Sequence, residues 1–235
     1  MNTEFIQVAG ICSLDEATML VEEGVSHLGY PLVLDHHRED LSRDEVQRVI
    51  EHVGAAATHV VITYLTEPAE IVELVRGVGA TVCQLHAPVA PETLRRLKEN
   101  APEIEVIKSV VFHRDPPDAT ITRALDCCPW VDQFITDTFD PATGASGATG
   151  KTHDWSLSAA LVLESPRPVI LAGGLNPDNV HRAIHAVRPA GVDVHTGVEN
   201  SRGHKLRPLV RAFVEAARGA LAQTREGSTT SSIQK

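Results

Sequence analysis

Short apolar runs rich in valine and isoleucine alternate with longer amphipathic stretches along almost the whole chain. A short apolar run suits a buried strand, and a longer stretch with apolar residues on one face suits a helix packed against it. The alternation therefore predicts repeated strand–helix units. The candidate strands are residues 5–9, 26–30, 58–63, 81–85, 104–108, 131–136, 167–172 and 191–195.

Helix start signals lie between these strands. Ser13, Ser42 and the Asn176-Pro177 pair each precede an amphipathic stretch, and acidic residues occur in or near the first turn that follows. Eight strands, each followed by a helix, predict an α/β fold, a single (β/α)8 TIM barrel, whose usual length is about 250 residues. A doubly wound open sheet is the alternative.

The length of the chain allows either two small domains or one barrel, since α/β barrels of this size are routinely one domain. We expect residues 1–222 to form the barrel, with the last helix ending near Leu221. Residues 223–235 are polar, rich in Ser and Thr, and without periodicity. This composition predicts a disordered C-terminal tail.

The charge balance limits the partners of the protein. The chain has 21 Lys and Arg against 31 Asp and Glu, a formal net charge of −10. This balance argues against nucleic-acid and anionic-membrane partners, which require clustered basic residues. Four cysteines, two of them adjacent, and an N-terminus unlike a signal peptide predict reduced thiols and a cytoplasmic location.

Residues 147–152, GATGKT, end like a nucleotide-binding P-loop. That motif requires a glycine five residues before its Gly-Lys pair, directly after a strand. Ala145 occupies that position, and the nearest candidate strand is separated from Gly150 by a long segment that includes Pro141. An ATPase is therefore disfavoured, and a flexible surface loop remains open.

In a (β/α)8 barrel the chemistry lies at the C-terminal ends of the strands, and phosphate often binds the loops after strands 7 and 8. The loop after the seventh candidate strand contains Gly173 and Gly174, and the loop after the eighth contains Thr196 and Gly197. Backbone N–H groups at such glycines can approach a phosphate closely. The alternative is that both loops are tight turns that need glycine.

Two segments carry a family resemblance: TGKTHDW (149–155) and RPVILAGGLNPDNVHRAIHAVRPAGVDVHTGVEN (167–200). Together with QLH (84–86) and VIK (106–108), they resemble the phosphoribosylanthranilate isomerase family of tryptophan biosynthesis. That family converts a phosphoribosyl amine from an aldose to a ketose by an Amadori rearrangement. The resemblance implies an aldose-ketose isomerase without a cofactor, in which GATGKT is an active-site loop.

The resemblance also assigns roles to single residues. It implies that Asp137, at the end of the sixth strand, is the general acid that protonates the ribose ring oxygen. Arg38 falls where the family has an arginine that binds the substrate carboxylate. A guanidinium suits this role because it can donate two hydrogen bonds to one carboxylate. His86 and Asp193 match positions that line the site, and Asp193 is a partner for sugar hydroxyls.

The position of the catalytic base departs from the family pattern. The family has Lys-Ile-Cys-Gly at the end of strand 1, whereas this chain has Gln7, Val8, Ala9 and Gly10. Alanine cannot accept a proton, and loss of a general base costs about 10²–10⁴-fold in rate. Isomerase chemistry in this chain is therefore expected to be impaired or altered.

Two residues could replace the missing cysteine. Cys12 lies past the end of the strand, which is a poor position for a base. His195 takes the place of a family serine and shares a side of its strand with Asp193, facing the barrel mouth. We therefore take His195 as the candidate catalytic base. A hydrogen bond from this histidine to the phosphate or to a loop carbonyl is the alternative.

Other functions remain open at this level. The chain could be a related phosphosugar-converting enzyme with a different substrate, or a non-catalytic phosphosugar-binding protein. The run Asp35-His36-His37 could suggest a metal site, but consecutive residues rarely converge on one ion, so we expect no metal and no cofactor. The expected partner is a small phosphorylated sugar-amine, bound by a monomer or homodimer.

Overall fold

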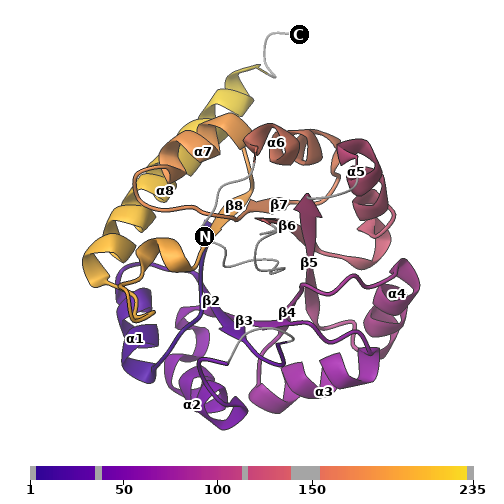
Figure 1. The fold of residues 1–235 in the computed structure, drawn as a ribbon, viewed down its shortest axis with the longest axis vertical. Helices are drawn as coiled ribbons and strands as arrows, with labels where there is room; N and C mark the ends of the chain where they lie inside the picture. The colour runs from indigo at the N-terminus through magenta and orange to yellow at the C-terminus, as the bar shows by residue number, and fades with distance from the viewer. Residues whose placement is uncertain (1–3, 35–38, 113–115, 139–153, 232–235) are drawn as a thin grey trace.

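The strands of the protein close into a parallel barrel. The structure, a computed structural model, describes residues 4–34, 39–112, 116–138 and 154–231. Each strand pairs with the next along the chain, and β8 pairs with β1 (Figure 1). The predicted TIM barrel is confirmed, and the open-sheet alternative is wrong. The strands are β1 Phe5–Ala9, β2 His27–Pro31, β3 Thr58–Thr63, β4 Val82–Leu85, β5 Glu105–Phe112, β6 Gln133–Thr138, β7 Val169–Leu171 and β8 Gly191–Val194.

Helices form a ring around the barrel (Figure 1). Ser13 and Ser42 accept hydrogen bonds from the first turns of α1 and α2, as predicted, and Ser42 completes a capping box with Glu45. Three further helices begin with proline at the first position, where no N–H group is needed. The helices are α1 Leu14–Glu22, α2 Arg43–Val53, α3 Pro68–Val78, α4 Pro91–Asn100, α5 Pro117–Leu125, α6 Trp155–Glu164, α7 Val180–Val187 and α8 Arg207–Ser231.

Two helix ends differ from the sequence-based prediction. The α7 helix begins at Val180 rather than directly after Pro177, because the Asn176 side chain accepts hydrogen bonds from the backbone of Asp178 and Asn179 and forms a turn first. The α8 helix continues to Ser231, although a tail was predicted from residue 223. Leu221 is the last apolar residue of α8 that is buried among those whose burial is described, so the predicted end of the barrel matches the end of its buried face rather than the end of the helix.

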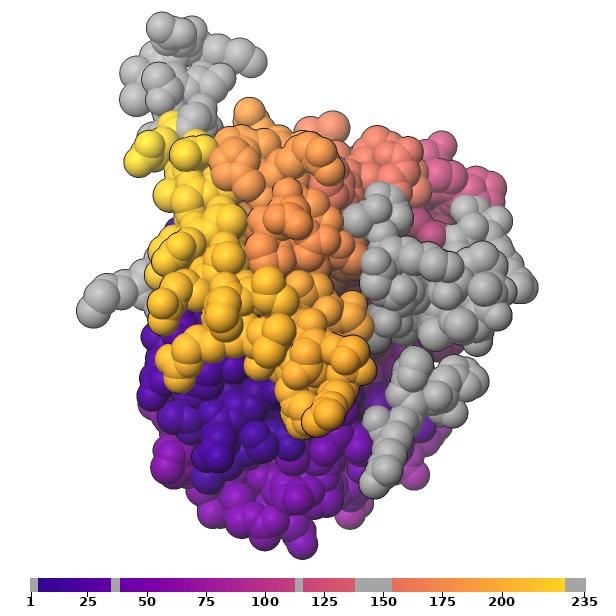
Figure 2. All heavy atoms as spheres, turned by 60° about the vertical axis from the view of Figure 1, so that its left-hand side comes forward, coloured from indigo at the N-terminus to yellow at the C-terminus, as the bar shows by residue number. Residues whose placement is uncertain are grey.

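The last helix packs beside the first elements of the chain. Figure 2 shows α8 in yellow next to the indigo N-terminal segments. The guanidinium groups of Arg207 and Arg211 both form salt bridges with the carboxylate of Glu23, which follows α1. These contacts hold the two ends of the barrel sequence together. Among the helices of the described residues, none combines the length and the apolar character needed to cross a membrane.

Strand alternation separates two hydrophobic clusters. One lies between the strands and the helices, and the other fills the barrel interior. Because side chains alternate along a strand, β1 directs Phe5, Gln7 and Ala9 inward. The interior cluster consists of Phe5, Ala9, Val60, Ile62, Val82, Ile107, Ile135, Ile170 and Ala172. Polar side chains replace these apolar ones toward the C-terminal ends of the strands.

Candidate active site

Asp137 lies at the C-terminal end of β6, as predicted. It follows the interior residue Ile135 by two positions, so strand alternation directs it into the barrel mouth. Asp137 is 4% exposed, and its Oδ2 lies 3.2 Å from Nδ1 of His86, which follows β4. The His86 ring in turn stacks on Tyr64, with 5.6 Å between ring centroids. The structure therefore brings the predicted acid and His86 together.

A chain of polar side chains crosses the barrel from Asp193 to His86. The Gln7 side-chain amide donates to Oδ1 of Asp193 at 2.9 Å and to Oε1 of Gln84 at 2.8 Å. The Gln84 amide nitrogen then lies 2.8 Å from Nε2 of His86. The two carboxylates of the site, Asp193 and Asp137, are thus connected through three intervening side chains.

This network sets the tautomer of His86. Oε1 of Gln84 already accepts from Gln7, so its amide nitrogen donates to Nε2 of His86. The ring proton must then be on Nδ1, which faces Asp137. The two atoms are close but not aligned for a good hydrogen bond. His86 can therefore stabilise charge on Asp137 electrostatically and still allow it to transfer a proton to another atom.

Asp193 is surrounded by protein, although one side is open to the barrel mouth. Burial raises its pKa to about 6, despite the opposing effect of the hydrogen bond from Gln7. Oε1 of Gln7 is buried and has no hydrogen-bond partner in the described part of the chain. A sugar hydroxyl that enters the mouth could donate to this oxygen. The contact of Asp193 with sugar hydroxyls stays a prediction.

His195 packs on Gly10, the residue that follows Ala9. In the parallel register Gln7 is paired with Asp193 and Val8 with Val194, and the next residues along the chain are Ala9, the last residue of β1, and His195, which directly follows β8. Ala9 is buried in the barrel interior. A Cβ atom added to the next residue, Gly10, would lie 2.0 Å from Nε2 of His195. The imidazole therefore packs directly on the segment from which the family base would project.

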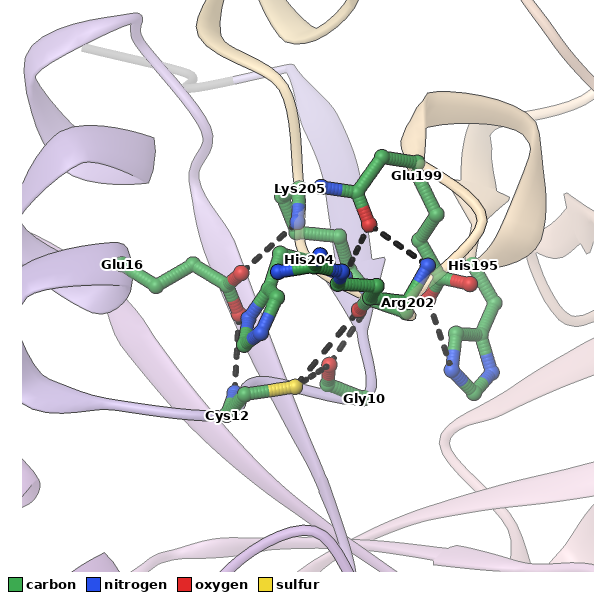
Figure 3. Close-up of polar contacts among 10 residues, drawn as sticks. Gly10, Cys12, Glu16, His195, Glu199, Arg202, His204 and Lys205 are labelled. Atoms are coloured by element: carbon green, nitrogen blue, oxygen red, sulfur yellow. Dashed lines mark hydrogen bonds and ion pairs between the residues drawn. The ribbon is translucent and has the colours of Figure 1, made fainter.

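The half-buried carboxylate of Glu199 contacts His195 and is itself bonded to the buried amine of Lys205 (Figure 3). Nε2 of His195 lies 3.2 Å from Oε1 of Glu199, and the same oxygen bonds Lys205. Lys205 also donates to the carbonyl of Gly10 at 2.8 Å. Burial acts to raise the pKa of Glu199, but its bonds to His195 and Lys205 outweigh burial and lower it. Glu199 is therefore an anion that fixes one nitrogen of the imidazole.

Cys12 does not lie in the barrel interior. Its Sγ contacts the carbonyl oxygens of Gly10 and Gly203 at 3.7 and 3.6 Å, on the rim of the mouth. Burial and the nearby charges of Glu16 and Asp40 raise its pKa to about 11. The thiol is therefore protonated near neutral pH and is a poor replacement for the base.

The two predicted phosphate loops lie against each other. Gly173 and Gly174 have φ angles of +99° and +65°, which only glycine adopts without strain. The other loop forms the short 3₁₀ turn η3, Thr196–Val198. A Cβ atom on Gly197 would lie 1.9 Å from the carbonyl oxygen of Leu175, so glycine is required at this contact.

Some predicted features lie outside the described residues: Arg38, the run Asp35-His36-His37 and the GATGKT loop. Two contributors to the site were missed by the sequence analysis. Gln84 lies two residues before His86 on the same face of β4, and Glu199 follows His195 by four residues. Strand alternation could have indicated Gln84, whereas Glu199 depends on the conformation of the loop after β8.

Comparison with known proteins gives a consistent result. The family model described as N-(5'phosphoribosyl)anthranilate (PRA) isomerase matches residues 6–216. N-(5'-phosphoribosyl)anthranilate isomerase 2 of Methanosarcina mazei is 35% identical over 94% of this chain and 96% of its own. The isomerase of Haloferax volcanii is 43% identical over 74% of this chain and 76% of its own.

Solved structures agree with these relatives. Phosphoribosyl anthranilate isomerase from Thermotoga maritima superposes with a TM-score of 0.77 at 30% identity, over 91% of this chain and 98% of the other. A phosphoribosyl anthranilate isomerase in complex with reduced 1-(o-carboxyphenylamino)-1-deoxyribulose 5-phosphate gives 0.75 at 28% identity, over the same shares of the two chains. The chain belongs to the N-(5'-phosphoribosyl)anthranilate isomerase family.

Proposed function

We propose that this barrel isomerises N-(5'-phosphoribosyl)anthranilate in tryptophan biosynthesis, with Asp137 as general acid and His195 as general base. One observation carries the proposal. The mouth holds a buried carboxylate beside His86 on one side, and on the other side an imidazole packs on the backbone next to Ala9. Family membership supplies the substrate, and these two groups supply the proton transfers.

The reaction needs one proton given and one removed. Asp137 would protonate the ribose ring oxygen, so that the bond from this oxygen to C1 breaks and an iminium forms between C1 and the anthranilate nitrogen. His195 would then take the proton from C2, and the electron pair of that bond neutralises the iminium to give an enolamine. Tautomerisation of the enolamine gives the ketose, in which C1 has gained a hydrogen.

Glu199 suits His195 to the role of base. Its carboxylate lies 3.2 Å from Nε2, so Nε2 carries the ring proton and Nδ1 has the lone pair that accepts another. Lys205 neutralises part of the charge of Glu199 and anchors it to the carbonyl of Gly10. The carboxylate also stabilises the imidazolium that forms when the base is protonated.

Substrate binding would use the two glycine loops and the arginine expected from the family. Backbone N–H groups at Gly173, Gly174 and Gly197, with the hydroxyl of Thr196, would bind the phosphate, since these loops meet at the C-terminal ends of β7 and β8. Arg38 would bind the anthranilate carboxylate. His86 and Asp193 would contact the sugar.

Steady-state kinetics on N-(5'-phosphoribosyl)anthranilate test the proposal. We expect turnover in the wild type, a loss of about 10²–10⁴-fold in kcat for His195→Ser, and a comparable loss for Asp137→Asn. Phosphate affinity, measured by calorimetry with a ribulose-phosphate-type ligand, should change little in either variant. Asp132→Asn is a matched control, because this carboxylate bonds Lys98 and the backbone of Val106 away from the mouth.

Ala9→Cys separates two explanations of the altered base. If His195 is the base, the restored thiol should rescue the His195→Ser variant and add little to the wild type. A large gain from Ala9→Cys in the wild type, with no loss in His195→Ser, would show that the chain has no working base of its own. Absence of turnover in every variant, with phosphosugar binding retained, would overturn the isomerase assignment.

We further propose that the protein acts in the cytoplasm as a monomer or homodimer. The phosphoribosylanthranilate isomerase of Thermotoga maritima is described both as a dimer and as monomers generated from it, so this fold is compatible with a monomer and with a homodimer. Analytical ultracentrifugation at several protein concentrations would distinguish the two states. A larger assembly would contradict the proposal.

A further inference from the structure

A cysteine, a glutamate and a histidine converge on the rim of the barrel. The thiol of Cys12, the carboxylate of Glu16 and the imidazole of His204 have ligand atoms that all lie within 4.8 Å of one another. Figure 3 shows the Glu16 carboxylate directed between Lys205 and Cys12, with the His204 side chain beside it. We propose that these three side chains bind a divalent transition-metal ion of the zinc class.

Hydrogen bonds arrange the three ligands before any ion binds. Oε2 of Glu16 accepts from the backbone N–H of Cys12 at 2.8 Å, and Oε1 accepts from that of Lys205 at 2.7 Å. Glu16 is 8% exposed and thus fixed between the loop after β1 and the loop before α8. Each carboxylate oxygen retains a second lone pair, so these bonds leave it able to coordinate a cation.

The loop that carries His204 is also fixed. The Asn200 side chain accepts from the backbone of Arg202 at 2.8 Å and from that of His204 at 3.2 Å. Gly203 adopts a φ of +83°, which allows the tight turn. The imidazole is therefore presented from a closed turn, and its exposed side gives an ion access from solvent.

The chemistry of the set favours a borderline metal ion. Thiolate, imidazole and carboxylate are the ligands that zinc uses, and a three-ligand site leaves the fourth tetrahedral position for water. Zinc–sulfur and zinc–nitrogen bonds of about 2.3 and 2.0 Å require the ligand atoms to move together by roughly 1 Å. The exposed His204 side chain can make this movement.

The charge around Cys12 favours a cation over a free thiolate. The negative charges of Glu16, Asp40 and Glu199 oppose ionisation of the thiol, whereas the positive charge of Lys205 favours it. When the ion binds, the S–H bond breaks, a sulfur–metal bond forms and the proton passes to the buffer, without any oxidation. The ion would cross-link the loop after β1 to the loop before α8, close to Gly10, on which His195 packs.

Titration of the purified chain with Co²⁺ tests the site directly, because thiolate coordination gives a charge-transfer absorption that histidine and carboxylate do not. We expect this band to saturate at one equivalent, to disappear in Cys12→Ser and to weaken at least tenfold in apparent affinity in His204→Ala. Zinc should displace the cobalt. Zinc should also raise the Tm of the wild type, but not that of Cys12→Ser.

Two control variants address the competing sites in the described chain. His181 and His185 are exposed one turn apart on α7, with 4.6 Å between ring centroids, and could bind the same ion without a thiolate. Cys128 is a partly exposed thiol elsewhere. The cobalt band should persist in both His181→Ala and Cys128→Ser. Its absence from the wild type, its survival in Cys12→Ser, or its loss in Cys128→Ser would each overturn the proposal.

Discussion

Replacing Asp193 by asparagine should stabilise the fold at neutral pH. Burial raises the pKa of this carboxyl to about 6 from an ordinary value of 3.8, so the folded protein holds the charged form at a cost. The groups that face it are Gln7, which donates a hydrogen bond, and the charges of His195, Asp137 and His86. Asparagine keeps an oxygen for Gln7 and removes the charge.

The magnitude follows from the pKa difference. A shift of about 2 units corresponds to about 3 kcal/mol, which we reduce to about 2 kcal/mol because the barrel mouth admits solvent to Asp193. The folded state binds this proton at higher pH than the unfolded state does. Below about pH 4 Asp193 is neutral in both states and costs no stability. As the pH rises from about 4 to about 6 the unfolded state loses this proton first, so the free energy of unfolding falls, and above about pH 6 the loss is constant.

Urea unfolding of the wild type and of Asp193→Asn, measured from about pH 4.5 to about pH 7.5, isolates this contribution. The free energy of unfolding of the variant should exceed that of the wild type by about 2 kcal/mol at the upper pH, and the difference should shrink toward the lower pH. Because the two proteins share every other titrating group, the difference cancels those groups. A difference that is independent of pH, or that grows toward acid, would refute the reasoning.

Three other substitutions have defined outcomes. Gly197→Ala should raise the KM of the phosphorylated substrate by about ten- to a hundredfold, because the added Cβ would lie 1.9 Å from the carbonyl oxygen of Leu175 and displace the loop. Steady-state kinetics measures the KM and calorimetry the phosphate affinity; if both were unchanged, the two loops would not bind the phosphate. Glu199→Gln should lower kcat at least about tenfold with little change in KM, since His195 loses its orienting carboxylate; equal kcat values would exclude this role. Burial lowers the pKa of Lys108 to about 8, so at neutral pH the folded protein holds a buried charge at a cost that disappears once the amine is deprotonated near pH 10. The gain in unfolding free energy from Lys108→Met, measured in urea, should therefore be larger at neutral pH than near pH 10, and the reverse order would contradict a buried charge.

Much of the fold could be predicted from the sequence because periodicity and capping are local. Strand β1 and the caps Ser13 and Ser42 were predicted correctly, since each depends on a few neighbouring residues. The extension of α8 to Ser231 was not predicted, because residues 223–231 are polar and have no apolar periodicity that would indicate a helix. Helix ends depend on the preceding turn as well as on composition.

The site could be predicted only in part. Asp137 and Asp193 follow from strand alternation and the family resemblance, and their placement in the barrel mouth depends on the strand alone. The contact of His195 with Glu199 and the bond from Lys205 to Gly10 join a loop after β8 to the end of β1. Contacts between the two ends of a chain leave no spacing signal in its sequence.

Three residues depart from the family pattern in this region, Gln7, Ala9 and His195, and the structure places them close together. Gln7 and Ala9 lie on β1, and His195 directly follows the adjacent strand β8, whose Asp193 is paired with Gln7. A lysine at position 7 would stabilise the ionised form of Asp193, whereas the neutral Gln7 leaves its pKa near 6. The ring of His195 packs on Gly10, the residue after Ala9, and Glu199 contacts its Nε2. Under the proposed mechanism, the imidazole after β8 takes over the proton-accepting role that the family assigns to a thiol on β1, and it does so from a position packed against Gly10.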